Sequence, residues 1–283
     1  MEPLQRFFRP DLRRPVAVIA FEGWSDASEA ATGALAFLLG QFEADPFAAI
    51  QPEDFFNFPA RRPLVEVDEQ GLRRLNWPVT NFFALSMPQA DRDVLAVMGE
   101  EPHLRWRAFS RLVLEILEEG KVEEVMLLGA FIGQVAHTLP VPIVGVATDP
   151  DLIARYGLIS SRYQGPTGIV GVLLEAFRDT GLPATSLWAA VPHYLAANPN
   201  PKAMLALVSK ASDILGFQLD TSELRTVSGE FESRIEAAMQ ESEDFAQYVR
   251  GLESAPSNLE QVDPEAGRRL VQEVEEFLRQ HGV

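Results

Sequence analysis

The stretch Val16-Ala17-Val18-Ile19-Ala20-Phe21-Glu22-Gly23-Trp24-Ser25-Asp26-Ala27 joins an apolar run to a polar loop and the start of a helical pattern. The run 16–21 is short and rich in small and β-branched residues, which predicts a buried strand. Asp26 with Glu29 three residues later predicts a capping-box start for the next helix. One face of that helix carries Ala27, Ala31, Ala34, Leu35 and Leu38. Strand, loop and helix in this order form the unit of an α/β sheet.

The same unit recurs along the chain. An apolar strand precedes Gly99-Glu100-Glu101-Pro102-His103-Leu104-Arg105-Trp106, and a helix with Trp106, Phe109, Val113, Ile116 and Leu117 at helical spacing follows and ends at Gly120. Further buried strands are predicted at 125–128, 142–147 and 187–191, and a further helix at 167–179. Residues 81–85 are expected to begin a βα unit. This alternation predicts a three-layer α/β fold with a mostly parallel sheet.

The middle section has a different pattern. Residues 54–58, 64–67 and 72–77 are short apolar or aromatic runs, and the last two flank a turn at Asp68-Glu69-Gln70-Gly71. Such runs around a turn are typical of antiparallel strands. We expect them to be antiparallel additions to the main sheet.

Strand patterns end near residue 200. The sequence predicts an α/β domain over residues 1–197 and a helical hairpin over 198–254, with helices at 201–216 and 221–253. Residues 255–283 are expected to form a linker and a final helix that starts at Asp263, with Pro264 at its first position. That helix would carry an apolar stripe of Leu270, Val274, Phe277 and Leu278.

Composition excludes several function classes. The 283-residue chain has no cysteine, which rules out disulfides, thiolate-bound zinc and a cysteine nucleophile. Its net charge of −17 opposes binding to nucleic acid or an anionic membrane. No apolar run approaches the roughly 20 residues of a membrane span, and the N-terminus lacks the pattern of a secretory signal. We therefore expect a cytoplasmic protein.

Polar and aromatic side chains follow the predicted strands, at the edge where ligands bind in open α/β sheets. This predicts a shared cleft that binds a ligand, with no metal. Its candidate residues are Glu22, Trp24, Asp26, Glu101, His103, Arg105, His137, Tyr163, Thr167 and His193.

Each candidate also has a structural interpretation. Asp26 suits a helix cap better than a catalytic acid. Glu101 with His103 fits an acid/base pair, but a glutamate in the first turn also complements the helix dipole. His137 and His193 lack the spacing of metal ligands, and structural histidines are the favoured interpretation.

Several enzyme chemistries have no matching motif. The chain lacks a Gly-x-Ser-x-Gly elbow, which opposes nucleophilic hydrolysis. It also lacks a glycine-rich phosphate loop, and its three lysines, Lys121, Lys202 and Lys210, fall outside the predicted strand ends. The sequence therefore predicts no cofactor and favours a protein that is not an enzyme.

Taken in order, the motifs resemble the proteasome assembly chaperone 2 family in its archaeal and actinobacterial form. The resemblance spans about residues 15–205. It rests on Gly23-Trp24-Ser25-Asp26-Ala27, Gly99-Glu100-Glu101-Pro102 with Trp106, Leu128-Gly129-Ala130, Tyr163-Gln164-Gly165-Pro166-Thr167-Gly168-Ile169, and Pro192-His193-Tyr194 with Asn198-Pro199.

The resemblance implies a fold similar to the purine nucleoside phosphorylase and peptidyl-tRNA hydrolase group, with a helical C-terminal extension. It implies a non-catalytic assembly chaperone or scaffold that forms a homo-oligomer, with a trimer as one arrangement, and has protein partners such as proteasome subunits. Some relatives dock by a C-terminal hydrophobic-Tyr-any tail, whereas this sequence ends Gln280-His281-Gly282-Val283. The alternative function is an enzyme or small-ligand binder that uses the strand-end cleft.

Overall fold

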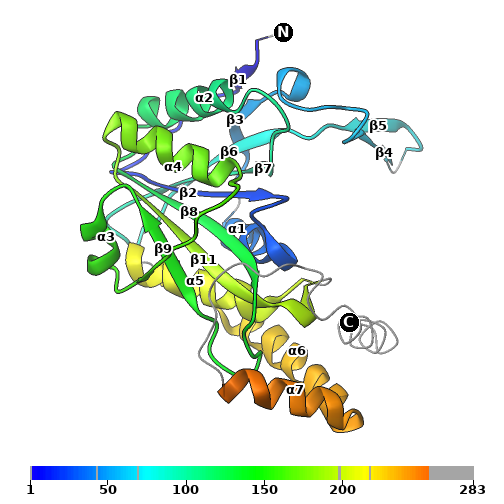
Figure 1. The fold of residues 1–283 in the computed structure, drawn as a ribbon. Coiled ribbons are helices and arrows are strands. Elements are labelled where there is room, and N and C mark those ends of the chain that lie inside the picture. Colours follow the sequence, from blue (N-terminus) through cyan, green and yellow to red (C-terminus); the bar gives the residue numbers. More distant parts are fainter. Residues whose placement is uncertain (1, 43, 69, 197–198, 217, 255–283) are drawn as a thin grey trace.

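The computed structural model describes residues 2–42, 44–68, 70–196, 199–216 and 218–254. A nine-stranded sheet runs through the molecule (Figure 1). Its order is β1 (Leu4–Arg6), β3 (Pro46–Ile50), β6 (Thr80–Leu85), β7 (Val94–Glu100), β2 (Val16–Glu22), β8 (Glu124–Gly133), β11 (Ala184–Pro192), β9 (Ile143–Ala147) and β10 (Ile159–Ser160).

The sheet is parallel only at its centre. Strands β7, β2, β8 and β11 are mutually parallel neighbours, whereas β1, β3 and β6 are antiparallel additions on one side. On the other side β9 runs antiparallel to β11 and pairs in parallel with β10. The predicted α/β architecture is confirmed, with a mixed sheet in place of a mostly parallel one.

Helices cover both faces of the central strands. Alternate side chains of β2 point to opposite faces, so Ala17, Ile19 and Phe21 pack under α2 (Trp106–Glu119) and α4 (Ile169–Thr180). Val16, Val18 and Ala20 pack under α1 (Ala30–Gly40) and α5 (Pro201–Leu215). Because both faces are covered, β2 is apolar along nearly its whole length.

The small residues of α1 allow a close approach to α5. Of the predicted apolar face, Ala31, Ala34, Leu35 and Leu38 are buried and Ala27 is half-buried, and Ala30 is buried in addition. A Cβ at Gly33 would collide with the side chain of Met204 on α5. The two helices therefore pack side by side on one face of the sheet.

The C-terminal part of the described chain continues with α6 (Ser222–Glu241) and α7 (Glu243–Ser254). The sequence predicted one helix over 221–253, but Ser242 has an extended conformation and its hydroxyl accepts a hydrogen bond from the Phe245 amide at 3.3 Å. Ser242 thus ends one helix and caps the next. The predicted linker and final helix lie outside the described residues.

The middle section differs from the prediction. Residues 54–58 form no strand, and β4 (Leu64–Val67) pairs with β5 (Arg73–Asn76) in a separate two-stranded sheet. The strand at Pro46–Ile50 was missed, because its proline and two alanines give a weak strand pattern. Residues 80–85 pair antiparallel with β7 and begin no βα unit.

Short 3₁₀ turns and the helix α3 (Pro150–Arg155) complete the described fold. The turns span Ala27–Glu29, Pro52–Asp54 and His193–Leu195. Among the described residues no helix is both long and apolar enough to cross a bilayer.

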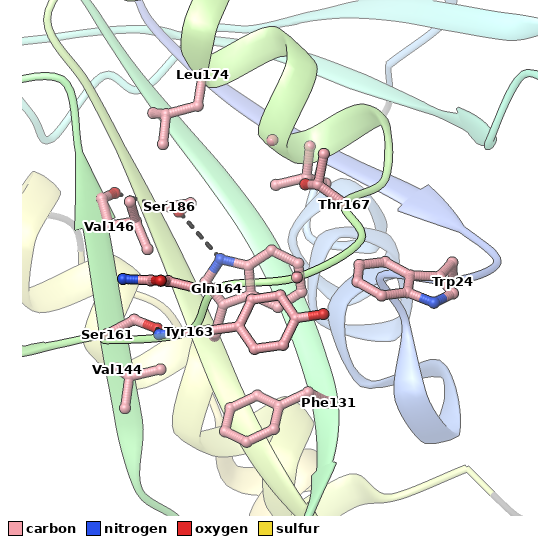
Figure 2. A pocket seen from close by; sticks show the side chains of 14 residues that line it. Trp24, Phe131, Val144, Val146, Ser161, Tyr163, Gln164, Thr167, Leu174 and Ser186 are labelled. Atoms are coloured by element: carbon pink, nitrogen blue, oxygen red, sulfur yellow. Dashed lines mark hydrogen bonds between the residues drawn. The ribbon is translucent and has the colours of Figure 1, made fainter. Parts of the chain in front are cut away.

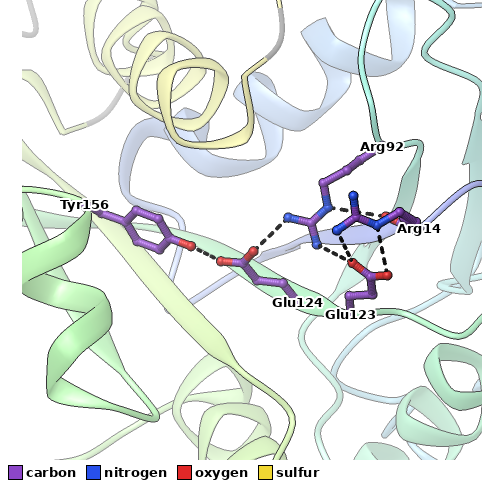
Figure 3. Close-up of polar contacts among 5 residues, drawn as sticks. All are labelled: Arg14, Arg92, Glu123, Glu124 and Tyr156. Carbon is purple, nitrogen blue, oxygen red and sulfur yellow. Dashed lines mark hydrogen bonds and ion pairs between the residues drawn. The ribbon is translucent and has the colours of Figure 1, made fainter.

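A polar network joins the starts of the parallel strands, at the edge opposite the predicted site (Figure 3). Glu124 of β8 forms an ion pair with Arg92 at 2.9 Å and accepts a hydrogen bond from the Tyr156 hydroxyl. Burial and this bond to Glu124 raise the pKa of Tyr156 to about 12. The neighbouring Glu123 pairs with the more exposed Arg14 at 3.2 Å.

We predict that Glu124→Ala lowers the free energy of unfolding by roughly 1–3 kcal/mol, because Arg92 and Tyr156 lose a partly buried partner. Glu123→Ala is the matched control, and its exposed ion pair is expected to cost less than about 1 kcal/mol. Urea unfolding of both variants measures the difference. Equal losses would contradict this assignment.

Candidate functional site

The structure divides the ten candidate residues into four groups, so the predicted shared cleft does not form. Glu22, Glu101 and His103 line an open hollow at the ends of β2 and β7. The side chains of Trp24, Tyr163 and Thr167 line a separate apolar pocket. His137 and His193 are buried beside α7, and the two remaining residues, Asp26 and Arg105, lie at helix starts.

Glu101 connects the first two groups. Its carboxylate Oε1 accepts a hydrogen bond from the Ile169 amide, at the first turn of α4, over 2.7 Å. Its own amide donates to the Glu22 carbonyl at 2.9 Å. A negative charge at a helix N-terminus is stabilising, because the first amides of a helix have no partner within it. Glu101 therefore caps a helix that begins 68 residues further along the chain.

Glycines allow the loops to close around this carboxylate. A Cβ at Gly168 would collide with Glu101 Oε1 and lie 2.9 Å from Ser25 Oγ. Gly23 has φ +113°, which strains any other residue, and a Cβ there would lie 3.3 Å from that of Glu101. The motifs at 23–27, 99–102 and 163–169 thus meet at one point.

The hollow beside Glu101 is polar and acidic. Glu22 and Glu100 are directly opposite on paired strands, and Arg61 pairs with Glu100. Burial, followed by the charges of Glu100 and Asp26, raises the pKa of Glu22 above its ordinary value. His103 is exposed, and its Nδ1 accepts a hydrogen bond from the Asn57 amide at 3.3 Å.

The apolar pocket has a volume of about 340 Å³ and lies between α4 and the strands β8, β11 and β9 (Figure 2). In Figure 2, Leu174 lies above it and Phe131 below it, with Trp24 and Val146 at opposite sides. Trp188 belongs to its lining and donates from Nε1 to Ser186 Oγ at 3.0 Å. A Cβ at Gly129 would lie 2.6 Å from the Trp188 ring, so that glycine leaves room for the indole.

His137 holds α7 against the end of the sheet. The Tyr194 hydroxyl lies 2.8 Å from both the His137 amide and His137 Nδ1. The imidazole ring of His137 stacks on Phe245 of α7. The hydroxyl accepts from the His137 amide, and the direction of its second contact depends on which ring nitrogen of His137 carries the proton. Burial, followed by the charge of Lys202, lowers the pKa of His137 to about 4.

His193 makes a similar contact. Its Nε2 lies 2.8 Å from the hydroxyl of Tyr248, which also belongs to α7. Burial lowers the pKa of His193 below its ordinary value. Both histidines therefore contact side chains of α7, and neither lines the Glu101 hollow or the apolar pocket.

Asp26 and Arg105 are engaged in local structure. Asp26 Oδ1 accepts from the amides of Ala31 at 2.7 Å and Thr32 at 3.2 Å, which makes Asp26 a cap for α1. Burial raises its pKa, although these hydrogen bonds act in the opposite direction. Glu29 has a left-handed conformation, so the predicted capping box does not form. Arg105 pairs with Asp54 at 2.5 Å.

The arrangement offers two separate surfaces. The Glu101 hollow presents carboxylates and one exposed histidine, and the pocket presents aromatic and aliphatic groups. No group of three or more potential metal ligands occurs among the described residues. Sequence reasoning missed the pocket-lining residues Phe131, Val144, Ser186 and Trp188, because strand residues give no sign of which face a helix leaves uncovered.

The model of the PAC2 family matches residues 20–239. The chain belongs to the PAC2 family. A PAC2 family protein from Streptomyces avermitilis is 42% identical, with 83% of this chain and 99% of that chain covered and a TM-score of 0.78. A Mycobacterium tuberculosis proteasome-assembly chaperone homologue is 37% identical, with 83% and 99% covered and a TM-score of 0.76.

The fold extends to more distant structures. The archaeal proteasome activator PbaB from Pyrococcus furiosus is 19% identical, with 83% of this PAC2 chain and 97% of that chain covered and a TM-score of 0.66. At this identity the likeness concerns the fold alone. No curated protein matches the chain.

We predict that Glu101→Ala lowers the free energy of unfolding by about 1–2 kcal/mol, because α4 loses its cap. Gly168→Ala is expected to destabilise as well, since its Cβ displaces the same carboxylate. Glu100→Ala is the matched control, and its pair with a more exposed arginine is expected to cost less. Denaturant unfolding measures all three, and an unchanged Glu101→Ala variant would refute the cap.

We predict that His137 makes stability fall as the pH decreases from about 6.5 to about 4. The unfolded chain binds a proton in this window and the folded chain does not, so the slope reaches about 1.4 kcal/mol per pH unit. His137→Gln should lose this part of the pH dependence. The exposed His103→Gln is the control, and thermal unfolding at several pH values gives the comparison. The same pH dependence of stability in the wild type, His137→Gln and His103→Gln would contradict the role of His137.

Proposed function

We propose that this PAC2 protein is a non-catalytic assembly chaperone or scaffold whose partners are proteasome subunits. One observation carries the proposal: 37% identity to a proteasome-assembly chaperone homologue over 83% of this chain and 99% of that one. Near-complete coverage of the relative means that the same elements are available to both proteins. We also propose that the chain forms a homo-oligomer in the cytoplasm.

The contacts of the acidic and basic groups support a non-catalytic role. A catalytic acid or base must reach its substrate with a proton to give or take. The carboxylates of Asp26 and Glu101 are instead bonded to helix amides, and Glu100 is paired with Arg61. His137 is bonded to Tyr194. Of the exposed titratable candidates, Arg105 is paired with Asp54 and the Tyr163 hydroxyl donates to the Pro166 carbonyl, which leaves His103 and Glu22.

We further propose how the chain is divided. The α/β part over 1–197 would provide self-association, and residues 198–254 with 255–283 would provide partner surface. We propose that the α/β part belongs to the purine nucleoside phosphorylase and peptidyl-tRNA hydrolase fold group. The parallel centre of its sheet and the helices on both faces support this. On α6, Val227 is 45% exposed, and in this proposal it would contact the partner.

The proposal predicts that the tagged full chain, co-expressed with the proteasome α and β subunits of the organism that encodes it, binds α subunits in stoichiometric amounts. Native mass spectrometry of the purified complexes measures this. Val227→Asp is expected to weaken the complex at least tenfold, because it places a charge in an apolar contact.

The control is Leu104→Asp, which changes an equally exposed leucine before α2. Recovery of the chain without any proteasome subunit, from cells that contain folded α subunits, would refute the proposed partner. Equal effects of the two aspartates would refute the assignment to α6.

A further inference from the structure

The β4–β5 hairpin, called the arm from here on, projects from the molecule beyond β6 (Figure 1). Its strands pair with each other in the register Val65 to Leu75 and Val67 to Arg73. All eight strand residues are exposed. A lone two-stranded hairpin is at best marginally stable in water. An arm of this kind gains stability when it packs against another surface.

The two faces of the arm differ. On one face Asn76 donates to Glu66 at 3.2 Å, and Arg74 pairs with Asp68 at 3.2 Å. The polar groups of this face are therefore satisfied within the arm, and the face also carries the exposed Leu64 and Leu72. Because side chains alternate along a strand, the opposite face carries three aliphatic residues and the arginine at position 73. The aliphatic residues are Val65, Val67 and Leu75, which are 55%, 64% and 56% exposed.

The apolar pocket under Trp24 and Tyr163 has the complementary chemistry. Its lining is mostly aromatic and aliphatic, and both of these rim residues are more than 40% exposed. Within one chain the arm points away from it (Figure 1). The arm leads into β6, and three strands separate β6 from the pocket strand β11, a distance of about 19 Å at ~4.8 Å per strand. Figure 1 shows the arm pointing away from β9 and β11.

Charge also favours a second copy as the partner. Residues 61–77 contain four arginines and three acidic residues, in a chain with a net charge of −17. Arg73 forms no ion pair with any described residue, and it shares a face with the aliphatic side chains. The exposed Glu22 lines the acidic hollow, which lies on the other side of Glu101 from the first turn of α4. A bound arm would bring the arginine close to this acidic edge.

We propose that the apolar face of the arm packs into the apolar pocket of a second copy of this chain. Arm and pocket are different surfaces, so the contact is head-to-tail. An open assembly leaves one arm and one pocket free at its ends until a ring closes. This inference deepens the self-association proposed above, and it does not depend on the identity of the proteasome partner.

The first test changes the apolar face of the arm. Val65→Ser, Val67→Ser and Leu75→Ser together should turn an oligomer of the full chain into a monomer, measured by light scattering after size exclusion. The variant should still unfold in one cooperative transition, because these side chains are exposed in the single chain, and its melting temperature should fall only by the stabilisation that association supplies. Leu64→Ser with Leu72→Ser is the matched control, since it removes two leucines of similar exposure that lie on even-numbered positions, away from that face. A monomeric wild-type chain, or a triple variant that stays oligomeric, would overturn the proposal.

The second test uses the absence of cysteine from the chain. Val67→Cys on the arm and Gln164→Cys at the pocket are made in separate chains, and the two are mixed and treated with a short bismaleimide. Covalent dimers should contain one chain of each kind. Dimers from Val67→Cys alone would mean that arms pair with each other, and would refute the pocket as acceptor.

Other occupants of the pocket give distinct results. Association of a chain that ends at Ser254, without association of the full chain, would mean that residues 255–283 fill the pocket. The native mass spectrum could also show a bound small molecule. Its loss from the Gln164→Trp variant, in which the pocket is narrower, would mean that the pocket binds a ligand. Either result overturns the proposal. Proteasome binding is measured on the same triple variant, so its loss or retention is scored separately from self-association.

Discussion

The carboxylate of Glu101 occupies the N-terminus of α4, and the arrangement of the whole carboxyl edge depends on it. A helix start attracts a negative charge, and here the charge comes from a different βα unit. The bond fixes the direction of α4, which forms the upper wall of the apolar pocket. On its other side the same residue lines the acidic hollow. One side chain therefore positions both surfaces that face solvent at this edge.

Related contacts start the helices on the opposite face. Asp26 accepts from two amides of α1, and Asn200 accepts from the Ala203 amide at the start of α5. The Ser28 hydroxyl joins these two helix starts through the carbonyls of Leu195 and Ala196. Polar residues at strand ends thus serve the packing of helices on the sheet. A PAC2 chain with this pattern resembles an enzyme in its sequence motifs because caps and catalytic groups use the same residue types.

The sequence predicted the central strands and the main helices because their apolar periodicity is strong and local. The run Val16–Phe21 is apolar on both faces, so it is stable only where helices cover the sheet on both sides. Its burial could therefore be predicted from the sequence alone. The strand at Pro46–Ile50 and the separate hairpin depend on pairing partners, which a local pattern does not identify. The ten candidate residues lie at the ends of strands or in the loops and helix starts that follow them, but strand order, which separates β2 from β9, decides which of them meet. Glu101 and Gly168 come together through a contact across 67 positions, and that contact has no local signal.

The close pairing of α1 with α5 has a consequence for synthesis of the chain. The side of α1 that contacts α5 leaves the ribosome about 160 residues before α5 does. At the usual rate of roughly 5–20 residues per second, that side stays uncovered for about 10–30 s. A protein proposed to assist the assembly of others therefore has a slow, aggregation-exposed step in its own co-translational folding.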